Sequence, residues 1–153
     1  MNEGHSPSTE EVIRIGNIEI RYLQEAGAGC QMGCFEMRVP PNSMVPPPHS
    51  HPSNEELVYV LEGTLRYTVG SNMRDLHAGD SMATPRGEVH AFSNPHADVA
   101  RALVINTPDI GSDYFREVAS IVNRAGPPDK AALVAIMRKF GLVPATPPTA
   151  PRQ

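Results

Sequence analysis

Three histidines and one glutamate in this sequence have the types and spacing of a metal-binding set. His49 and His51 are two residues apart, so an extended backbone would point both imidazoles to the same side. Glu56 begins an aliphatic run, and His90 stands near the start of another apolar segment. Imidazole and carboxylate groups together suit one divalent transition metal ion, such as Fe, Mn, Ni, Co or Zn. Four such ligands would leave coordination positions open, as a catalytic metal site requires.

The elements that would position these residues are short strands. Runs of alternating apolar and polar residues recur along the first two thirds of the chain, separated by turn signals such as Gly16-Asn17 and by many of the 16 prolines. Turn signals every 8–12 residues are typical of an all-β sandwich or barrel. The expected strands cover residues 12–15, 18–23, 34–39, 56–63, 64–70, 73–76, 81–84, 89–93 and 101–107.

Helical spacing replaces this pattern after Pro108. Apolar residues recur every three or four positions in two stretches, with Ser112 and Asp129 as N-caps and Gly141 as a C-terminal stop. Two such short helices cannot bury a core alone, so we expect them to pack on the barrel or on a second subunit. The expected division of the chain is a disordered start (1–11), the barrel (12–107), a helical extension (108–143) and a Pro-rich tail (144–153).

The spaced residues resemble the two motifs of the cupin superfamily. The first motif, G(X)5HXH(X)3–4E(X)6G, is matched by His49, His51, Glu56 and Gly63, with Ser43 in place of the leading glycine. The second motif, G(X)5PXG(X)2H(X)3N, is matched at every named position, by Gly79, Pro85, Gly87, His90 and Asn94. The resemblance implies an all-β cupin fold, an RmlC-like jelly-roll barrel, carrying the two short C-terminal helices. It also implies that the two motifs supply the metal ligands.

Two adjacent carboxylates compete for the fourth ligand position. The family spacing to Gly63 selects Glu56, and strand alternation then turns Glu55 outward into solvent. The predicted metal ligands are therefore His49, His51, Glu56 and His90. Glu56 is also the candidate catalytic base.

Alternation also predicts which side chains line the inside of the barrel near the metal. Val58 and Val60 share the face of Glu56, and Phe92 shares the face of His90. On the strand at 34–39, the apolar face carries Phe35 and Met37, and we expect this face to point inside. For the strand at 101–107 both faces remain possible, Arg101/Leu103/Ile105 or Ala102/Val104/Asn106. The predicted pocket is aliphatic with one or two aromatic rings, which suits a flat or partly hydrophobic substrate better than a sugar phosphate.

Charge and hydropathy exclude several kinds of partner. The net charge is −4 without a basic block, so nucleic acid is not expected as a partner. No apolar run approaches the ~20 residues of a membrane helix. The polar, acidic N-terminus lacks the features of a signal peptide, which favours a cytoplasmic protein. The likeness to cupins, together with the open sheet edges expected of such a barrel, predicts a homodimer.

These features favour a metal-dependent enzyme, and most specifically a non-haem dioxygenase acting on a small aromatic or enolisable molecule. Two alternatives remain open. One is isomerase, decarboxylase or lyase chemistry on a small keto acid or sugar, in which the metal polarises a carbonyl group. The other is a non-catalytic module that binds a metal or a ligand, because cupins host many functions.

Overall fold

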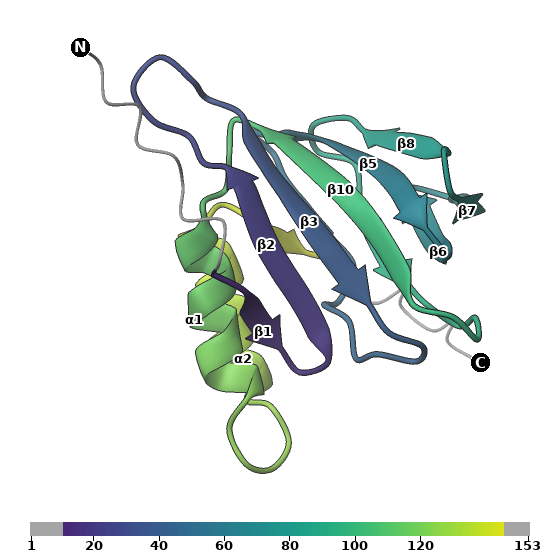
Figure 1. Cartoon of the computed structure of the whole chain (residues 1–153). Coiled ribbons are helices and arrows are strands. Elements are labelled where there is room, and N and C mark those ends of the chain that lie inside the picture. The colour runs from purple at the N-terminus through teal and green to yellow at the C-terminus, as the bar shows by residue number, and fades with distance from the viewer. Residues whose placement is uncertain (1–10, 146–153) are drawn as a thin grey trace, which may run out of the picture.

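The fold consists of two antiparallel β-sheets, as a computed structural model of residues 11–145 shows (Figure 1). The predicted disordered residues 1–10 and tail residues 146–153 lie outside the described part of the chain. The first sheet has the strand order β1-β2-β3-β10-β5-β8. Its strands are β1 (Ile13–Ile15), β2 (Ile18–Gln24), β3 (Gly33–Val39), β10 (Ala100–Thr107), β5 (Glu55–Glu62) and β8 (Ser81–Thr84).

The second sheet has the strand order β11-β4-β9-β6-β7 and carries most of the motif histidines. Its strands are β11 (Val143–Pro144), β4 (His49–Ser50), β9 (His90–Ser93), β6 (Thr64–Val69) and β7 (Asn72–His77). Buried side chains from both sheets form one hydrophobic core, with Phe35 and Val58 from the first and Leu65 and Leu76 from the second. The predicted all-β jelly-roll barrel is confirmed.

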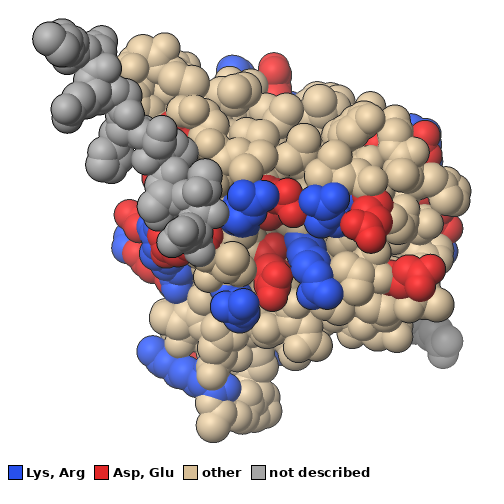
Figure 2. Space-filling view, viewed as in Figure 1, with Lys and Arg blue, Asp and Glu red and all other residues tan. Residues whose placement is uncertain are grey.

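The structure shows which face of β10 points into the barrel, a question that the sequence leaves open. Ala102, Val104 and Asn106 are buried, whereas Arg101 and its neighbours on the other face are partly exposed. This orientation leaves Arg101 on the outer face, where it forms ion pairs with Glu36 and Glu62 at 3.1 and 3.3 Å. Figure 2 shows such acidic and basic side chains interspersed over the outer face of this sheet. Pairs of this kind at the surface contribute little stability individually.

Two helices follow the barrel, as predicted: α1 (Ser112–Val122) and α2 (Lys130–Lys139). Asp129 caps α2, because its carboxylate accepts a hydrogen bond from the Ala132 N–H at 3.0 Å. The predicted cap of α1 is wrong by one residue. Gly111 holds the N-cap position with a φ of 86°, and Ser112 is the first helical residue.

The helices pack beside β1 and β2 and add a second cluster of buried side chains to the core (Figure 1). That cluster consists of Tyr114, Val118, Met137 and Leu142. Ile15 and Phe115 pack against both clusters, so the helices and the barrel share one continuous apolar interior. No helix in residues 11–145 is long and apolar enough to span a membrane.

The boundary predicted between the helical extension and the tail falls inside a strand. Val143 and Pro144 form β11, which pairs with Ser50 and His49 of β4. The Ala145 N–H continues this ladder by donating to the Pro48 carbonyl at 2.9 Å. The segment after the helices therefore supports the strand that carries His49.

The sheets have open edges at β1 and β8 in one and at β11 and β7 in the other. Exposed edges can pair with a second chain. The homodimer remains a prediction, since residues 11–145 are described as a single chain.

Substitution of Met137 tests how much the packing of the helices contributes to the stability of the fold. Its side chain is 2% exposed in the second cluster, so Met137→Ala should lower the free energy of unfolding by about 2–4 kcal/mol through lost burial and a residual cavity. Met73 on β7 is 61% exposed, and Met73→Ala should change that free energy by less than about 0.5 kcal/mol. Urea unfolding of both variants measures the difference, and equal midpoints would contradict the proposed packing.

Candidate metal centre

The two motifs meet because short strands of the second sheet pair with each other. His49 of β4 lies directly opposite His90 of β9 in the antiparallel register. His51 follows β4 immediately, and its carbonyl accepts a hydrogen bond from the Gly87 N–H at 3.0 Å. Gly87 has a φ of 80°, a backbone conformation that glycine adopts without strain. The turn of the second motif thus holds the backbone of the first.

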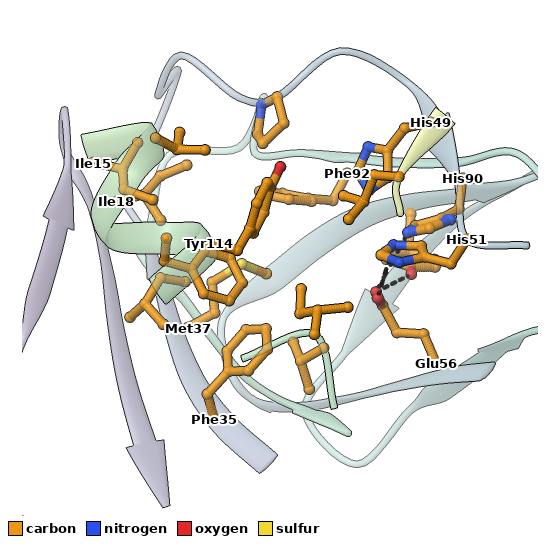
Figure 3. Close-up of a pocket in the computed structure, with 18 residues that line it drawn as sticks. Ile15, Ile18, Phe35, Met37, His49, His51, Glu56, His90, Phe92 and Tyr114 are labelled. Carbon is orange, nitrogen blue, oxygen red and sulfur yellow. Dashed lines mark hydrogen bonds and ion pairs between the residues drawn. The ribbon is translucent and has the colours of Figure 1, made fainter. Parts of the chain in front are cut away.

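The three imidazoles form a compact buried group. All ligand nitrogens of His49, His51 and His90 lie within 4.8 Å of one another, and all three residues are buried. The ring centroids are separated by 4.6–5.0 Å. Figure 3 shows the rings gathered at one end of a pocket. This three-histidine group could hold one metal ion.

Glu56 reaches the same group from β5 in the facing sheet. Its Oε2 lies 3.7 Å from Nε2 of His51, and its Oε1 lies 3.6 Å from Nε2 of His90. The hydroxyl of Tyr67 donates a hydrogen bond to Oε1 at 2.8 Å. Glu55 points outward, as predicted, with its side chain 60% exposed and 3.7 Å from Arg86. The structure therefore brings all four predicted ligands together.

Burial and neighbouring charges decide the protonation of the site. Burial opposes ionisation of Glu56, but His90, His51 and the Tyr67 hydrogen bond outweigh it and hold its pKa at about 2. Burial lowers the pKa of His51 to about 4 and also lowers the pKa of His49. Burial disfavours charge on His90 as well, yet the adjacent Glu56 carboxylate raises its pKa above 6.5.

The hydrogen bonds of the rings fit a bound metal. Nδ1 of His49 lies 2.9 Å from the Pro47 carbonyl, an arrangement that directs Nε2 to the other side of the ring. Both ring nitrogens of His51 are buried without a hydrogen-bond partner among residues 11–145. A buried polar atom without a partner is costly, and a metal ion would give a ring nitrogen of His51 the partner it lacks. Three imidazoles beside a carboxylate form a donor set for a borderline divalent metal.

A pocket of about 700 Å³, including its open mouth, extends from the imidazoles toward the helices (Figure 3). Phe35, Met37 and Phe92 line it, as predicted. The prediction for Val58 and Val60 is wrong. Both are 0% exposed and lie outside the pocket lining, because they pack in the filled part of the barrel opposite Val104 and Ala102.

Sequence reasoning missed much of the pocket wall. Tyr67 lies on β6 and contacts Glu56, although alternation along 64–70 could have placed it inside. The apolar stripe of α1 was recognised, but its position over the pocket was not. The further lining residues come from β1, β2, β10, α1 and the connecting loops: Ile15, Ile18, Ile20, Pro46, Val104, Ile110, Tyr114, Phe115, Val118 and Leu142.

The remaining motif residues shape the backbone. Gly63 has a φ of 71°, and a Cβ there would lie 2.2 Å from the Val99 carbonyl oxygen. Ser43 occupies the position of the leading glycine, and the adjacent Asn42 takes a positive φ of 54° in the turn. Asn94 is buried and donates to the carbonyls of Val39 and Asp98 at 2.9 and 2.8 Å. These residues position the ligand-bearing strands.

Removal of single ligands tests the metal site. We expect purified protein to carry roughly one transition metal ion per chain, and His51→Ala or His90→Ala should lower that content at least tenfold, because the ligands act as a set. His77→Ala is the matched control, since His77 is exposed on β7 and should leave the metal content unchanged. Elemental analysis measures the content, and two ligand variants that keep the full amount would refute the assignment.

The pH dependence of metal binding follows from the unequal imidazoles. A proton on His90 competes with the metal, and its raised pKa means that this competition already begins above pH 6.5. His51 stays neutral until about pH 4, and Glu56 stays ionised until about pH 2. Affinity should therefore fall about tenfold per pH unit below pH 6.5, as for one competing proton, and more steeply below about pH 4. Metal titrations at several pH values measure this slope. A constant affinity between pH 7 and pH 5 would contradict it.

Comparisons with known proteins agree with this geometry. A model of the cupin domain matches residues 35–106. Germin-like protein subfamily 2 member 1 of Arabidopsis thaliana is 40% identical over 63 residues, which cover 38% of this chain and 28% of that protein. The matches to the curated relatives span between 17% and 32% of those proteins' lengths.

Solved structures give a wider match. The polyketide cyclase RemF from Streptomyces resistomycificus is 26% identical, with a TM-score of 0.56 over 71% of this chain and 80% of that chain. A sugar phosphate isomerase of the cupin superfamily from Silicibacter pomeroyi is 28% identical, with a TM-score of 0.56 over 62% of each chain. Together with the two motifs and the two-sheet barrel, these matches support membership of the chain in the cupin superfamily.

Proposed function

We propose that this chain is a metal-dependent enzyme that acts on a small, flat, largely apolar molecule bearing an enolisable or phenolic oxygen. The observation that carries the proposal is the buried three-histidine group at one end of an otherwise apolar pocket. A polar reaction centre beside apolar walls suits a substrate with one oxygen-bearing end and a hydrophobic body. The most specific reaction class that we propose is that of a dioxygenase.

The walls of the pocket would bind and orient such a substrate. The rings of Phe35 and Phe115 meet edge to face with centroids 5.0 Å apart, and Tyr114 packs against Phe115 at 5.1 Å. Aromatic walls of this kind favour a flat partner, and they exclude water from the imidazole end. Within residues 11–145, no Lys or Arg lines the pocket, which disfavours phosphorylated substrates.

Glu56 would accept the substrate proton, and Tyr67 would hold Glu56 in position. His49, His51 and His90 would hold the metal, which supplies Lewis acidity and, if redox-active, reactivity toward O2. Glu56 is ionised at neutral pH and can accept the proton of a substrate hydroxyl whose own pKa the metal lowers. The Tyr67 hydroxyl stays neutral, because burial and the Glu56 charge raise its pKa, and its hydrogen bond holds the carboxylate in place.

A second candidate is O2-independent isomerisation or cyclisation of the same class of substrate. Glu56 lies 3.7 and 3.6 Å from two of the imidazoles, close enough to act as an acid or base beside a metal held by the three histidines. A polyketide cyclase among the structural neighbours supports this candidate. The apolar lining gives less support to the sugar phosphate chemistry that another neighbour's name implies.

Oxygen uptake separates the two candidates. With the iron-, nickel- or manganese-loaded protein and a panel of flavonols and catechols, a dioxygenase should consume one O2 per substrate lost. Glu56→Gln should lower the rate by about 10²–10⁴-fold, since it removes the proton acceptor. Glu55→Gln is the matched control: the neighbouring carboxylate is exposed, and its loss should leave the rate unchanged.

Substrate loss under strict anaerobiosis at an undiminished rate would exclude the dioxygenase and support the second candidate. Equal rates for the Glu55→Gln and Glu56→Gln variants would contradict the role of Glu56 as the proton acceptor.

A further inference from the structure

Asn106 is a buried polar residue that the proposed chemistry does not use. Its side chain on β10 is 0% exposed, and neither Nδ2 nor Oδ1 has a hydrogen-bond partner among residues 11–145. A buried amide without partners destabilises the folded state relative to a satisfied one. Such groups are rare in folded proteins and call for an explanation.

The strand register places Asn106 directly beside Glu56. Asn106 of β10 pairs with Glu56 of β5 on one side and with Gly33 of β3 on the other. Both side chains point inward, because each shares its face with buried residues, Val104 on β10 and Val58 on β5. Directly opposed residues of an antiparallel pair have Cβ atoms about 4.5–5.5 Å apart. Gly33 has no side chain, and the space beside it holds the Asp109 carboxylate, which already accepts hydrogen bonds from the Tyr22 hydroxyl and the N–H groups of Ala26 and Gly111. Glu56 is therefore the cross-strand side chain within reach of the Asn106 amide.

Glu56 now faces away from that amide, toward Tyr67 and the imidazoles. A carboxylate that serves as both a ligand and a base has to move between the two tasks. Each position must offer it a hydrogen-bond donor, because an unpaired charge is costly in a buried site. The amide of Asn106 provides such a donor on the side where the carboxylate otherwise has none.

We propose that Asn106 is a positioning residue that binds the Glu56 carboxylate when it turns away from His51 and His90, through Nδ2–H directly or through one buried water. Asn106 thereby sets the balance between two positions of Glu56. The inference rests on the proposed function, because it explains how Glu56 can leave the imidazoles to accept a proton.

Asn94 provides a contrast within the same chain. It is an asparagine of nearly equal burial, 2% exposed, but its Nδ2 donates to two carbonyls and its Oδ1 accepts from the His96 N–H at 3.0 Å. All of these bonds join backbone segments, so the role of Asn94 is structural. The two residues are matched in type and burial and differ in whether their hydrogen bonds are made.

The experiment compares Asn106→Leu with Asn94→Leu in the metal-free protein and in Co(II) titrations followed by visible absorption. Leucine is close in size to asparagine and removes the unsatisfied amide, so Asn106→Leu should raise Tm by about 2–4 °C. It should also strengthen Co(II) binding several-fold, because the carboxylate loses its second position and stays at the imidazoles. Asn94→Leu should instead lower Tm, because its hydrogen bonds to the backbone are lost, and it should not strengthen Co(II) binding.

A double-mutant cycle shows whether Asn106 acts through Glu56. In a Glu56→Gln background, Asn106→Leu should no longer change the Co(II) affinity. The proposal is overturned if Asn106→Leu lowers Tm, if it leaves Co(II) binding unchanged, or if its effect persists without the carboxylate. Absence of Co(II) binding by the wild type would overturn this proposal and the proposed function together. If the Co(II) affinities show coupling between Asn106 and Glu56 but no substrate is turned over, the role of Asn106 is supported and only the proposed reaction is contradicted.

Discussion

The carboxylate of Glu56 lies close to two buried imidazoles, its side chain is only 12% exposed, and the neighbouring elements are arranged around this charge. An ionised group in an apolar interior needs close partners of opposite charge or good hydrogen-bond donors. Tyr67 donates from the facing sheet, His51 approaches from the first motif, and His90 approaches from the second. The same low dielectric that makes the charge costly strengthens each of these interactions. The site is thus held by electrostatics that would be weak at the surface.

Holding that charge in place requires strands that are otherwise marginal. β4 consists of two residues and would not persist alone. It is fixed because β9 pairs with it on one side and β11 on the other. β11 in turn follows α2, whose buried Met137 joins the helices to the rest of the core. The C-terminal helices therefore have two structural effects: α1 walls the pocket, and α2 leads into the short strand that supports His49.

The sequence alone predicted the metal site better than the pocket, for physical reasons. Ligand chemistry demands particular residue types, and positions such as Gly63 and Gly87 demand particular backbone angles, so both leave a spaced pattern. Alternation likewise separated Glu55 from Glu56. Alternation gives only the face of a strand and says nothing of depth, which is why Val58 and Val60 were taken for pocket residues although they pack in the closed core. The apolar stripe of α1 showed that the helix covers something, but only the tertiary structure shows that it covers the pocket.

Asn94 and Asn106 show that burial and residue type alone do not define the role of a residue. Both amides are excluded from water, yet Asn94 binds three backbone groups and Asn106 binds none among residues 11–145. A fold selected for stability alone would place an apolar side chain at position 106, between the glycine of β3 and the carboxylate of β5. Native proteins retain such locally unfavourable groups mostly where function needs them. The same reasoning applies to His51, whose unpartnered nitrogens lie a few ångströms from Glu56. Among residues 11–145, three residues have buried side-chain atoms without a hydrogen bond: His51, Asn106 and His96, whose Nε2 lies 3.3 Å from Asp75 Oδ1. Two of the three, His51 and Asn106, adjoin Glu56, the group to which the proposed chemistry assigns the proton.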